Sequence, residues 1–252
     1  MNIRFDGKVV AVSGGGHGIG RAIARSFAAL GAVVFAADNN AENLRETASS
    51  GNITPAVVDL ADRRAAAAWI ADVERRIGGR SIFALVNNCG GVAGQTNKPI
   101  EQVTDEEWDA IFAVNIGAAM ALSRAVAPGM KRARAGRIII ISSGAGLQAS
   151  LTGIQAYCAA KHAEVGLTRQ LCHDLGPFGI TVNSVAPGFI RSNPSTEKQW
   201  ESYGPEGQKA LVERIALKHL GTAQNIADAV LFFASDLASF VSGQVLSVDG
   251  GR

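Results

Sequence analysis

The sequence is short of cysteine, of net charge and of long apolar runs, and each shortage excludes a class of protein. Its 252 residues contain three cysteines, Cys89, Cys158 and Cys172, an odd number without paired spacing. That pattern argues against a disulfide framework and suits the reducing cytoplasm. The net charge is only +2 and the basic residues are scattered, so the clustered basic face typical of nucleic-acid-binding proteins is missing.

Apolar residues are plentiful, but no long run of them is present. The first residues, MNIRFDGKVVAVSGG, hold no run long enough for a signal peptide, and nothing later approaches a membrane-spanning length. Apolar residues make up 47% and charged residues 18%, a globular composition. We therefore expect one cytoplasmic domain over residues 1–252, with neither membrane nor nucleic acid as a partner and without a metal site.

Short apolar runs alternate with helical patterns along the chain. The expected strands are residues 8–13, 32–38, 53–58, 81–86, 137–143, 179–185 and 243–248. The expected helices are residues 19–30, about 62–77, 104–132, the stretch around Tyr157 to residue 175, and 222–237. This alternation predicts an α/β fold, a parallel sheet with helices on both faces. Residues 193–218 are polar and irregular, which is typical of a lid or binding loop.

A glycine-rich turn separates the first expected strand from the first expected helix. Glycines allow a pyrophosphate to approach the backbone closely, and a helix amino terminus offers free N–H groups. The residues predicted to bind a dinucleotide here are Gly14, Gly16, His17, Gly18, Ile19 and Gly20. The alternative is a tight turn without a ligand.

The second expected strand ends in an acid, Asp38, at the spacing from the glycines expected for a carboxylate that binds the adenosine ribose hydroxyls. A ribose 2′-phosphate about 4 Å away would meet repulsion of about 4 kcal/mol per charge pair at an effective dielectric near 20. No arginine at positions 37–40 offsets this repulsion, which favours NAD over NADP. Asp38 is also a candidate cap for a helix that begins at Ala41, and the two roles are compatible.

Tyr157 and Lys161 are four residues apart, which places both side chains on one face of a helix. A nearby ammonium favours the phenolate and makes a tyrosine usable as an acid or base. Ser143 follows an apolar strand and is expected at its carboxyl end, where α/β sheets build their sites. Asn115 is a polar residue in the otherwise apolar helix 104–132 and is alone more often a packing residue.

The chain resembles the classical short-chain dehydrogenases/reductases over essentially its whole length. The matching motifs are Gly14-x-x-x-Gly18-x-Gly20, Asp59-Leu60, Asn87-Asn88-Cys89-Gly90, Asn115, Ser143, Tyr157-x-x-x-Lys161, Asn183, Pro187-Gly188 and the tail from Val241 to Gly251. The resemblance implies a single Rossmann-like, doubly wound, seven-stranded parallel sheet. It also implies a homotetramer, or else a dimer, with one interface supplied by the helices that hold Asn115 and Tyr157.

The resemblance further implies a role for each matching residue. Tyr157 would be the general acid/base, Lys161 would lower its pKa and bind the nicotinamide ribose, Ser143 would hold the substrate oxygen, and Asn115 would anchor a proton-relaying water. The implied cofactor-binding residues, besides the glycine-rich turn, Tyr157 and Lys161, are Asp38, Asn39, Asp59, Leu60, Asn88, Cys89, Gly90, Pro187, Gly188, Ile190 and Ser192. Cys89 replaces the family's usual alanine and Ser192 its usual threonine; we expect Cys89 to pack and not to be a catalytic thiol.

The predicted activity is hydride transfer between NAD and a secondary alcohol or ketone, with Tyr157 as a base in the oxidative direction. The polar lid favours a small polar substrate: a sugar, polyol or hydroxy acid. Arg191 is a candidate clamp for an anion, or simply a surface residue, and Gln148 and Gln155 are further substrate candidates. Two alternatives are a 3-oxoacyl thioester reductase, which would normally prefer NADPH, and a non-catalytic nucleotide-binding or interaction protein.

Overall fold

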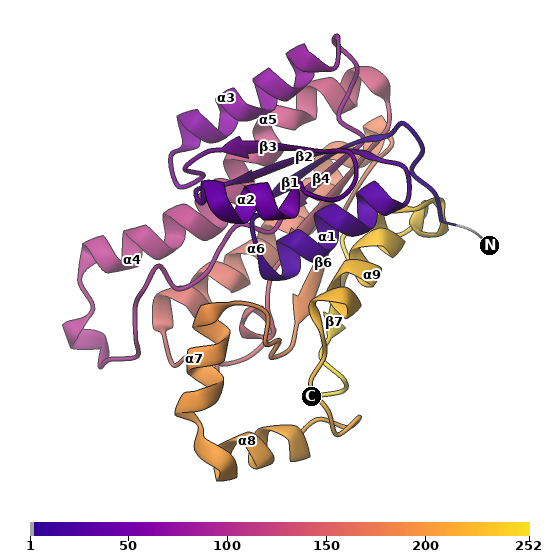
Figure 1. The fold of residues 1–252 in the computed structure, drawn as a ribbon. Helices are drawn as coiled ribbons and strands as arrows, with labels where there is room; N and C mark the ends of the chain where they lie inside the picture. The colour runs from indigo at the N-terminus through magenta and orange to yellow at the C-terminus, as the bar shows by residue number, and fades with distance from the viewer. Residues whose placement is uncertain (1–2) are drawn as a thin grey trace.

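Seven parallel strands form one sheet at the centre of the computed structural model, which describes residues 3–252 (Figure 1). The strands are β1 (Val9–Ser13), β2 (Val33–Asp38), β3 (Ile53–Val57), β4 (Ala84–Asn87), β5 (Gly136–Ile141), β6 (Ile180–Pro187) and β7 (Val245–Val248). Their order across the sheet is β3-β2-β1-β4-β5-β6-β7. The order reverses direction between β1 and β4, and ligands of such sheets bind at this point, beyond the carboxyl ends of the strands.

Helices cover both faces of the sheet, as the sequence predicted. The α-helices are α1 (Gly18–Ala29), α2 (Ala41–Thr47), α3 (Arg63–Arg76), α4 (Asp105–Phe112), α5 (Ala118–Ala133), α6 (Gln155–Leu175), α7 (Pro194–Ser202), α8 (Gly204–Glu213) and α9 (Ala223–Ala234). A π-helical turn, η2 (Ala113–Gly117), joins α4 to α5. The 3₁₀ turns are η1 (Ile100–Gln102), η3 (Gly144–Gly146), η4 (Gly176–Phe178) and η5 (Asp236–Ala238).

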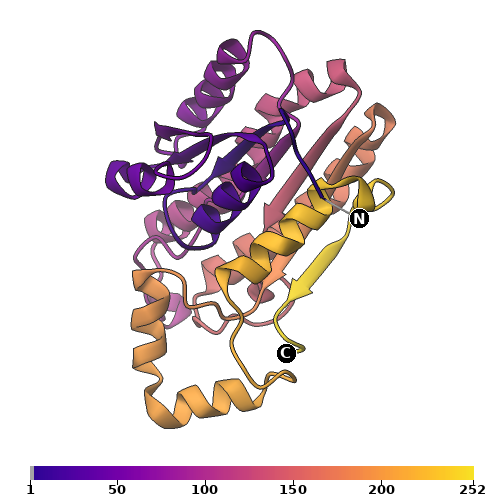
Figure 2. The ribbon, with the colours of Figure 1, turned by 45° about the vertical axis from the view of Figure 1, so that its right-hand side comes forward.

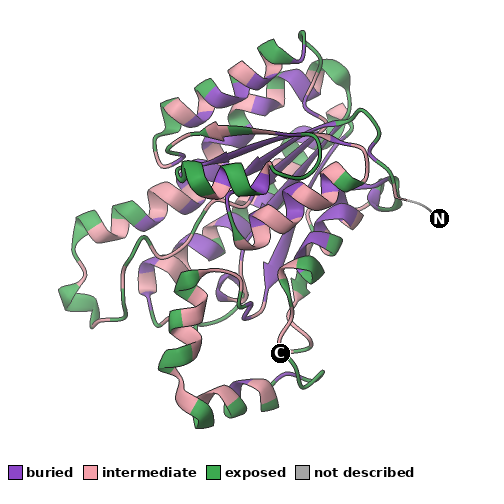
Figure 3. Cartoon of the chain, in the orientation of Figure 1, coloured by how far each residue is buried: buried purple, intermediate pink, exposed green. Residues whose placement is uncertain are grey.

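Two hydrophobic cores lie on opposite sides of the sheet because successive strand residues point to opposite faces. On β1, Val10 and Val12 join the core beneath α1 and α9, which pack against each other. Val9 and Ala11 join the core beneath α3, α5 and α6. Every residue of β1 is buried, as expected for a strand covered on both faces (Figure 3). The predicted doubly wound α/β architecture is confirmed.

The segment 193–218 is not irregular, contrary to the prediction. It forms α7 and α8, which project from the body of the protein below the sheet (Figure 2). The Asn193 side chain accepts a hydrogen bond from the Thr196 backbone, Thr196 bonds back to Asn193, and Pro194 occupies the first turn. This capping box and the proline begin a helix despite the polar composition.

The expectation that no segment approaches a membrane-spanning length is wrong, because one helix is long and apolar enough to cross a membrane. Residues 105–133 form one 29-residue helix, because the π-helical turn continues the helix through Asn115 and Gly117. Its most apolar window has a mean hydropathy of 1.6, and 50% of that window is buried inside the protein. α5 packs on α3 and the sheet. A core helix has these same properties, so this helix is weak evidence for a membrane span.

Candidate active site

One cavity of about 560 Å³ lies beyond the carboxyl ends of the central strands. Five of its lining residues stand at or just after strand ends: Gly14 after β1, Asp38 at the end of β2, Asn88 after β4, Ser143 after β5 and Pro187 at the end of β6. The cavity therefore joins the glycine-rich turn to the catalytic candidates that follow β5 and lie on α6.

The glycines of the turn are required by close packing. Gly14 and Gly18 have φ of 64° and 54°, in the left-handed region that favours glycine. A Cβ on Gly16 would lie 2.7 Å from Cγ of Asp38, and one on Gly20 would overlap the carbonyl oxygen of Gly14. Gly14 and Gly20 line the cavity, whereas Gly16 and Gly18 stand behind its wall. This geometry leaves the backbone open at the start of α1, as a pyrophosphate requires.

Asp38 is held in place by backbone N–H groups from two segments. Its Oδ2 accepts a hydrogen bond from Gly16 N at 2.9 Å, and its Oδ1 accepts one from Asn40 N at 3.0 Å. The alternative role as a helix cap is wrong, because Asn40 caps α2 through Asn43 N. Arg21 approaches this corner, but its guanidinium donates to Gly16 O and is paired with Glu46. Asp38 thus presents a fixed carboxylate to the cavity.

The loop after β4 is fastened to the glycine-rich turn. Asn88 Nδ2 donates to Gly14 O at 2.9 Å, and Ser13 Oγ accepts hydrogen bonds from the N–H groups of Asn88 and Cys89. Burial and, to a smaller extent, the Asp38 carboxylate raise the pKa of the Cys89 thiol to about 12. Cys89 is therefore protonated at neutral pH, in keeping with the expected packing role.

The π-helical turn orients Asn115, which is fully buried. Its Oδ1 accepts a hydrogen bond from Gly91 N at 3.0 Å, and its Nδ2 donates to Gly91 O and Ile111 O at 2.8 and 2.7 Å. A Cβ on Gly90 would lie 2.5 Å from Asn115 Oδ1 and 3.1 Å from Lys161 Nζ. Asn115 thus clamps the loop next to Lys161 but does not line the cavity. Its predicted water-anchoring role stays a prediction.

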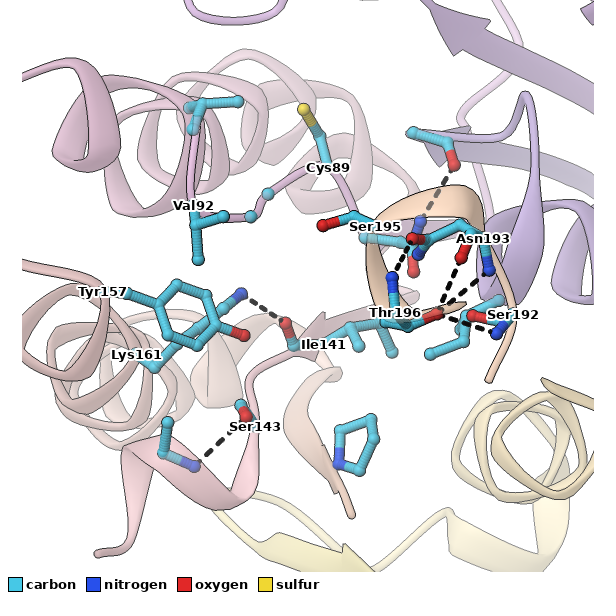
Figure 4. Close-up of a pocket in the computed structure, with 18 of the residues that line it drawn as sticks. Cys89, Val92, Ile141, Ser143, Tyr157, Lys161, Ser192, Asn193, Ser195 and Thr196 are labelled. Carbon is cyan, nitrogen blue, oxygen red and sulfur yellow. Dashed lines mark hydrogen bonds between the residues drawn. The ribbon is translucent and has the colours of Figure 1, made fainter. Parts of the chain in front are cut away.

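Ser143, Tyr157 and Lys161 face the same end of the cavity (Figure 4). Ser143 Oγ accepts a hydrogen bond from Ala145 N at 3.1 Å, which leaves its proton free to donate. Lys161 Nζ lies 5.8 Å from the centroid of the Tyr157 ring and donates to Ile141 O at 3.0 Å. The strand end and the helical i,i+4 spacing together bring these side chains into one site.

The segment after β6 forms the wall opposite α6. Gly188 N donates to Val248 O at 3.0 Å, and a Cβ on Gly188 would lie 2.9 Å from Cα of Asp249. Ser192 approaches the glycine-rich turn, since a Cβ on Gly18 would lie 2.8 Å from Ser192 O. Of the predicted cofactor residues, His17, Ile19, Asn39, Asp59, Leu60, Asn88, Cys89, Gly90, Pro187, Gly188, Ile190 and Ser192 line the cavity.

The three substrate candidates Gln148, Gln155 and Arg191 do not line this cavity. Gln155 Nε2 donates to Lys98 O at 3.0 Å. The Arg191 guanidinium bonds Glu197 at 2.8 and 3.0 Å and lies 5.3 Å from the centroid of the Trp200 ring. Arg191 is therefore engaged within the lid segment, and the structure gives none of the three a contact with the cavity.

Several lining residues were not predicted individually from the sequence. The cavity is also lined by Val92, Leu151, Phe189, Gln199 and Arg252, and we take these side chains as candidates for the substrate end. Gln199 lies on α7, in the predicted lid, whereas the others come from three separate loops and from the last residue of the sequence, so no spacing in the sequence connects them. The lid therefore supplies only part of the cavity wall.

The site fits a dinucleotide cofactor by its own geometry. Its elongated cavity has an open glycine turn and a helix amino terminus near one end, a fixed carboxylate at Asp38, and the Tyr157–Lys161 pair at the other end. Within residues 3–252, no group of three or more His, Cys, Asp or Glu side chains could hold a metal ion.

Comparisons with known proteins agree with this geometry. A family model described as enoyl-(acyl carrier protein) reductase matches residues 14–252. The 3-oxoacyl-[acyl-carrier-protein] reductase of Pseudomonas aeruginosa is 38% identical over 253 residues, covering 98% of each chain.

Two solved structures have the same fold. The 7α-hydroxysteroid dehydrogenase complexed with NADH and 7-oxo glycochenodeoxycholic acid has a TM-score of 0.89 and 31% identity, over 99% of this chain and 96% of that one. A protein from Beutenbergia cavernae with bound NADP, provisionally described as an NAD(P)-dependent gluconate 5-dehydrogenase, has a TM-score of 0.88 and 35% identity, over 98% and 97%. The chain therefore belongs to the short-chain dehydrogenase/reductase family of oxidoreductases.

Proposed function

We propose that this protein is an NAD-linked oxidoreductase that interconverts a ketone and a secondary alcohol. The observation that carries the proposal is the convergence of Ser143, Tyr157 and Lys161 on one end of a cavity whose other end holds the Asp38 carboxylate. A non-catalytic nucleotide-binding protein would need the Asp38 end only. The complete set at the opposite end supports catalysis over that alternative.

The chain's own residues handle the proton and the orientation of the substrate. Ser143, whose Oγ proton is free, donates a hydrogen bond to the substrate oxygen. Tyr157 gives its hydroxyl proton to that oxygen during reduction and takes it back during oxidation. Bound NADH or NAD supplies or accepts the hydride. Most of the rate enhancement comes from holding the reacting carbon and the nicotinamide in contact.

The choice of NAD over NADP is supported by Asp38. Both of its carboxylate oxygens already accept backbone hydrogen bonds, so the group cannot turn away from a 2′-phosphate without breaking them. Arg21 is engaged with Gly16 O and Glu46 and does not neutralise it. The relatives do not decide the matter, since one solved structure holds NADH and another NADP.

For the substrate, the comparisons favour a 3-oxoacyl thioester over the small polar molecule predicted from the lid. The Pseudomonas aeruginosa relative with 38% identity is named for that activity. Val92, Leu151 and Phe189 at the substrate end suit an acyl chain. The working direction would then be reduction, with Tyr157 as the acid, and not the oxidation predicted from NAD preference alone.

A hydroxy acid or sugar acid remains the second candidate, because Gln199 and Arg252 also line the substrate end. An arginine suits a carboxylate by paired hydrogen bonds. The relative provisionally described as a gluconate 5-dehydrogenase supports this candidate.

We expect the purified protein to oxidise NADH with a 3-oxoacyl thioester such as acetoacetyl-CoA, as followed by the nicotinamide absorbance. The same screen would include polyols, sugar acids and hydroxy acids with NAD.

Tyr157→Phe should lose about 10²- to 10⁴-fold in kcat while NADH affinity stays near that of the wild type, because the variant lacks the hydroxyl proton and keeps the aromatic ring. Retention of most turnover by Tyr157→Phe would overturn the mechanism, and a strong preference for NADPH would overturn the cofactor assignment.

We also propose that the protein works in the cytoplasm as a homotetramer, or else a dimer. The free cysteines support a reducing compartment. Exposed apolar side chains support self-association: Phe240, in the segment between η5 and β7, is fully exposed, and Leu246 on the edge strand β7 is 40% exposed.

A further inference from the structure

A second buried charge lies beside the catalytic lysine. Glu164 follows Lys161 by three residues on α6, so both side chains project from the same face of the helix. Glu164 is 1% exposed and Lys161 is 3% exposed. Nζ of Lys161 donates to Oε1 and Oε2 of Glu164 at 3.2 and 3.0 Å. Burial raises the pKa of Glu164 above its ordinary value, and the Lys161 ammonium opposes that rise. A carboxylate buried this deeply is costly unless a cation stays with it.

Two buried acceptors hold the Lys161 ammonium in place. An ammonium has three N–H donors. One side of Nζ faces both oxygens of the Glu164 carboxylate, and another N–H donates to Ile141 O at 3.0 Å. Lys161 also lines the cavity, so its remaining N–H is available for a ribose hydroxyl of the cofactor. Glu164 and Ile141 thus fix the position from which Nζ reaches the cavity.

The carboxylate also determines whether the lysine is charged. Burial by itself lowers the pKa of Lys161, but the Glu164 carboxylate and then Tyr157 more than offset burial, so the pKa stands above its ordinary value. The other titratable group that acts on Lys161 is Cys89, from the loop after β4. Cys89 has a pKa of about 12 and stays neutral at working pH. Glu164 is thus the only carboxylate in contact with this ammonium among residues 3–252.

We propose that Glu164 is a positioning residue of the active site: its buried carboxylate keeps Lys161 protonated and, together with Ile141 O, holds the ammonium at the cavity wall. The effect of Glu164 on turnover rests on the proposed function. Its effect on the charge of Lys161 does not. An exposed helical ion pair neither sets the charge of its lysine or arginine nor fixes its position. Asp72 and Arg75 on α3 have the same i,i+3 spacing, yet their side chains are 28% and 74% exposed.

The first experiment measures the charge of Lys161 without cofactor or substrate. Only a neutral amine reacts with acetic anhydride, so brief labelling followed by peptide mass spectrometry reports the neutral fraction of Lys161. At about pH 8, Lys161 of Glu164→Gln should be acetylated about tenfold faster or more than in the wild type, because loss of the carboxylate removes the largest effect that opposes burial. Glu164→Asp, which keeps the charge, and the control Asp72→Asn should label at the wild-type rate.

The second experiment measures kcat/KM for alcohol oxidation across pH. The wild type, Glu164→Asp and Asp72→Asn should reach a plateau on the alkaline side. Glu164→Gln should instead fall by about tenfold or more there, as Lys161 loses its proton and its support of the Tyr157 phenolate. The midpoint of that fall should match the midpoint of acetylation.

The two readouts separate the failure of this inference from that of the proposed function. If no substrate is turned over, the labelling rates still test the role of Glu164. Equal acetylation of Lys161 in Glu164→Gln and the wild type would overturn the inference even if the enzyme is active. Should Glu164→Gln fail to fold by circular dichroism, Glu164→Ala, which leaves room for water, is measured in its place with the same expected results.

Discussion

At the residue scale, Asp38 carries the proposed selection of NAD over NADP. The carboxylate is 9% exposed and is anchored at both oxygens by Gly16 N and Asn40 N. Because it cannot rotate away, a 2′-phosphate in the same corner meets its charge at close range. Repulsion of about 4 kcal/mol at 4 Å corresponds to a discrimination of about 10³-fold.

Replacing the Asp38 carboxylate should weaken the preference for NAD over NADP. In Asp38→Ser we expect the ratio of kcat/KM for NAD to that for NADP to fall by about 10²- to 10³-fold, because the repulsion is removed while a hydroxyl remains. The two backbone N–H groups lose their acceptors, so a small decrease in Tm should accompany the change. Glu42→Gln, which removes an exposed charge on the neighbouring helix α2, is the control and should leave the ratio unchanged. An unchanged ratio in Asp38→Ser would exclude Asp38 as the determinant.

Single residues differ in how far the sequence alone could assign them. Asp38, Ser143 and Asn88 could be predicted because each follows an apolar strand, and parallel strands bring their carboxyl ends to one edge. Glu164 could not, because an acid three residues after a lysine is usually an exposed helical pair. Nothing in the spacing shows that this face of α6 is buried.

Among the helices, α7 is the one whose stability depends most on the residues that cap it. Its nine residues carry no buried side chain, and a helix this short is marginal alone. The capping box of Asn193 and Thr196 begins it, and Trp200 stacks on Phe189 with ring centroids 5.9 Å apart. Both capping residues also line the cavity. The stability of α7 and the shape of the cavity are therefore coupled.

Loss of the cap should loosen α7 locally. Asn193→Ala should cost about 1 kcal/mol of local helix stability, which corresponds to about fivefold faster amide hydrogen exchange across residues 194–202. Thr222→Ala is the matched control, since Thr222 forms the same capping box on α9. Because α9 is packed in the core, that loss should lower the global Tm instead. Equal exchange of residues 194–202 in Asn193→Ala and the wild type would show that packing, not the cap, holds α7.

The elements predicted well from the sequence are those whose residues are all buried. β1 and β5 are buried at every residue, so their apolar runs mark them in the sequence. α7 and α8 were missed because their composition is polar, and in α7 the helical signal is confined to the capping residues and Pro194. The single helix predicted over 104–132 is confirmed as residues 105–133, because a π-helical turn absorbs Asn115 and Gly117 without ending the helix.

At the scale of the whole molecule, the two edges of the sheet differ. β3 carries Pro55, which has no N–H to donate and disfavours the addition of another strand. β7 contains no proline and is paired on one side only, with β6 (Figure 2). Phe240, just before β7, is fully exposed, and Leu246 on the strand is 40% exposed. The β7 edge is therefore the one suited to contact a second copy of the chain.

A charge at the β7 edge should weaken self-association. Burying one Phe side chain contributes about 1.5–3 kcal/mol, and a two-fold axis uses each contact twice. Phe240→Glu should therefore raise the dissociation constant by about 10²-fold or more, as measured by sedimentation equilibrium. Val57→Glu is the matched control, because Val57 is a 63% exposed apolar residue on the opposite edge strand, and it should leave the mass unchanged. If Phe240→Glu assembles as the wild type does, or if Val57→Glu dissociates instead, association does not use the β7 edge.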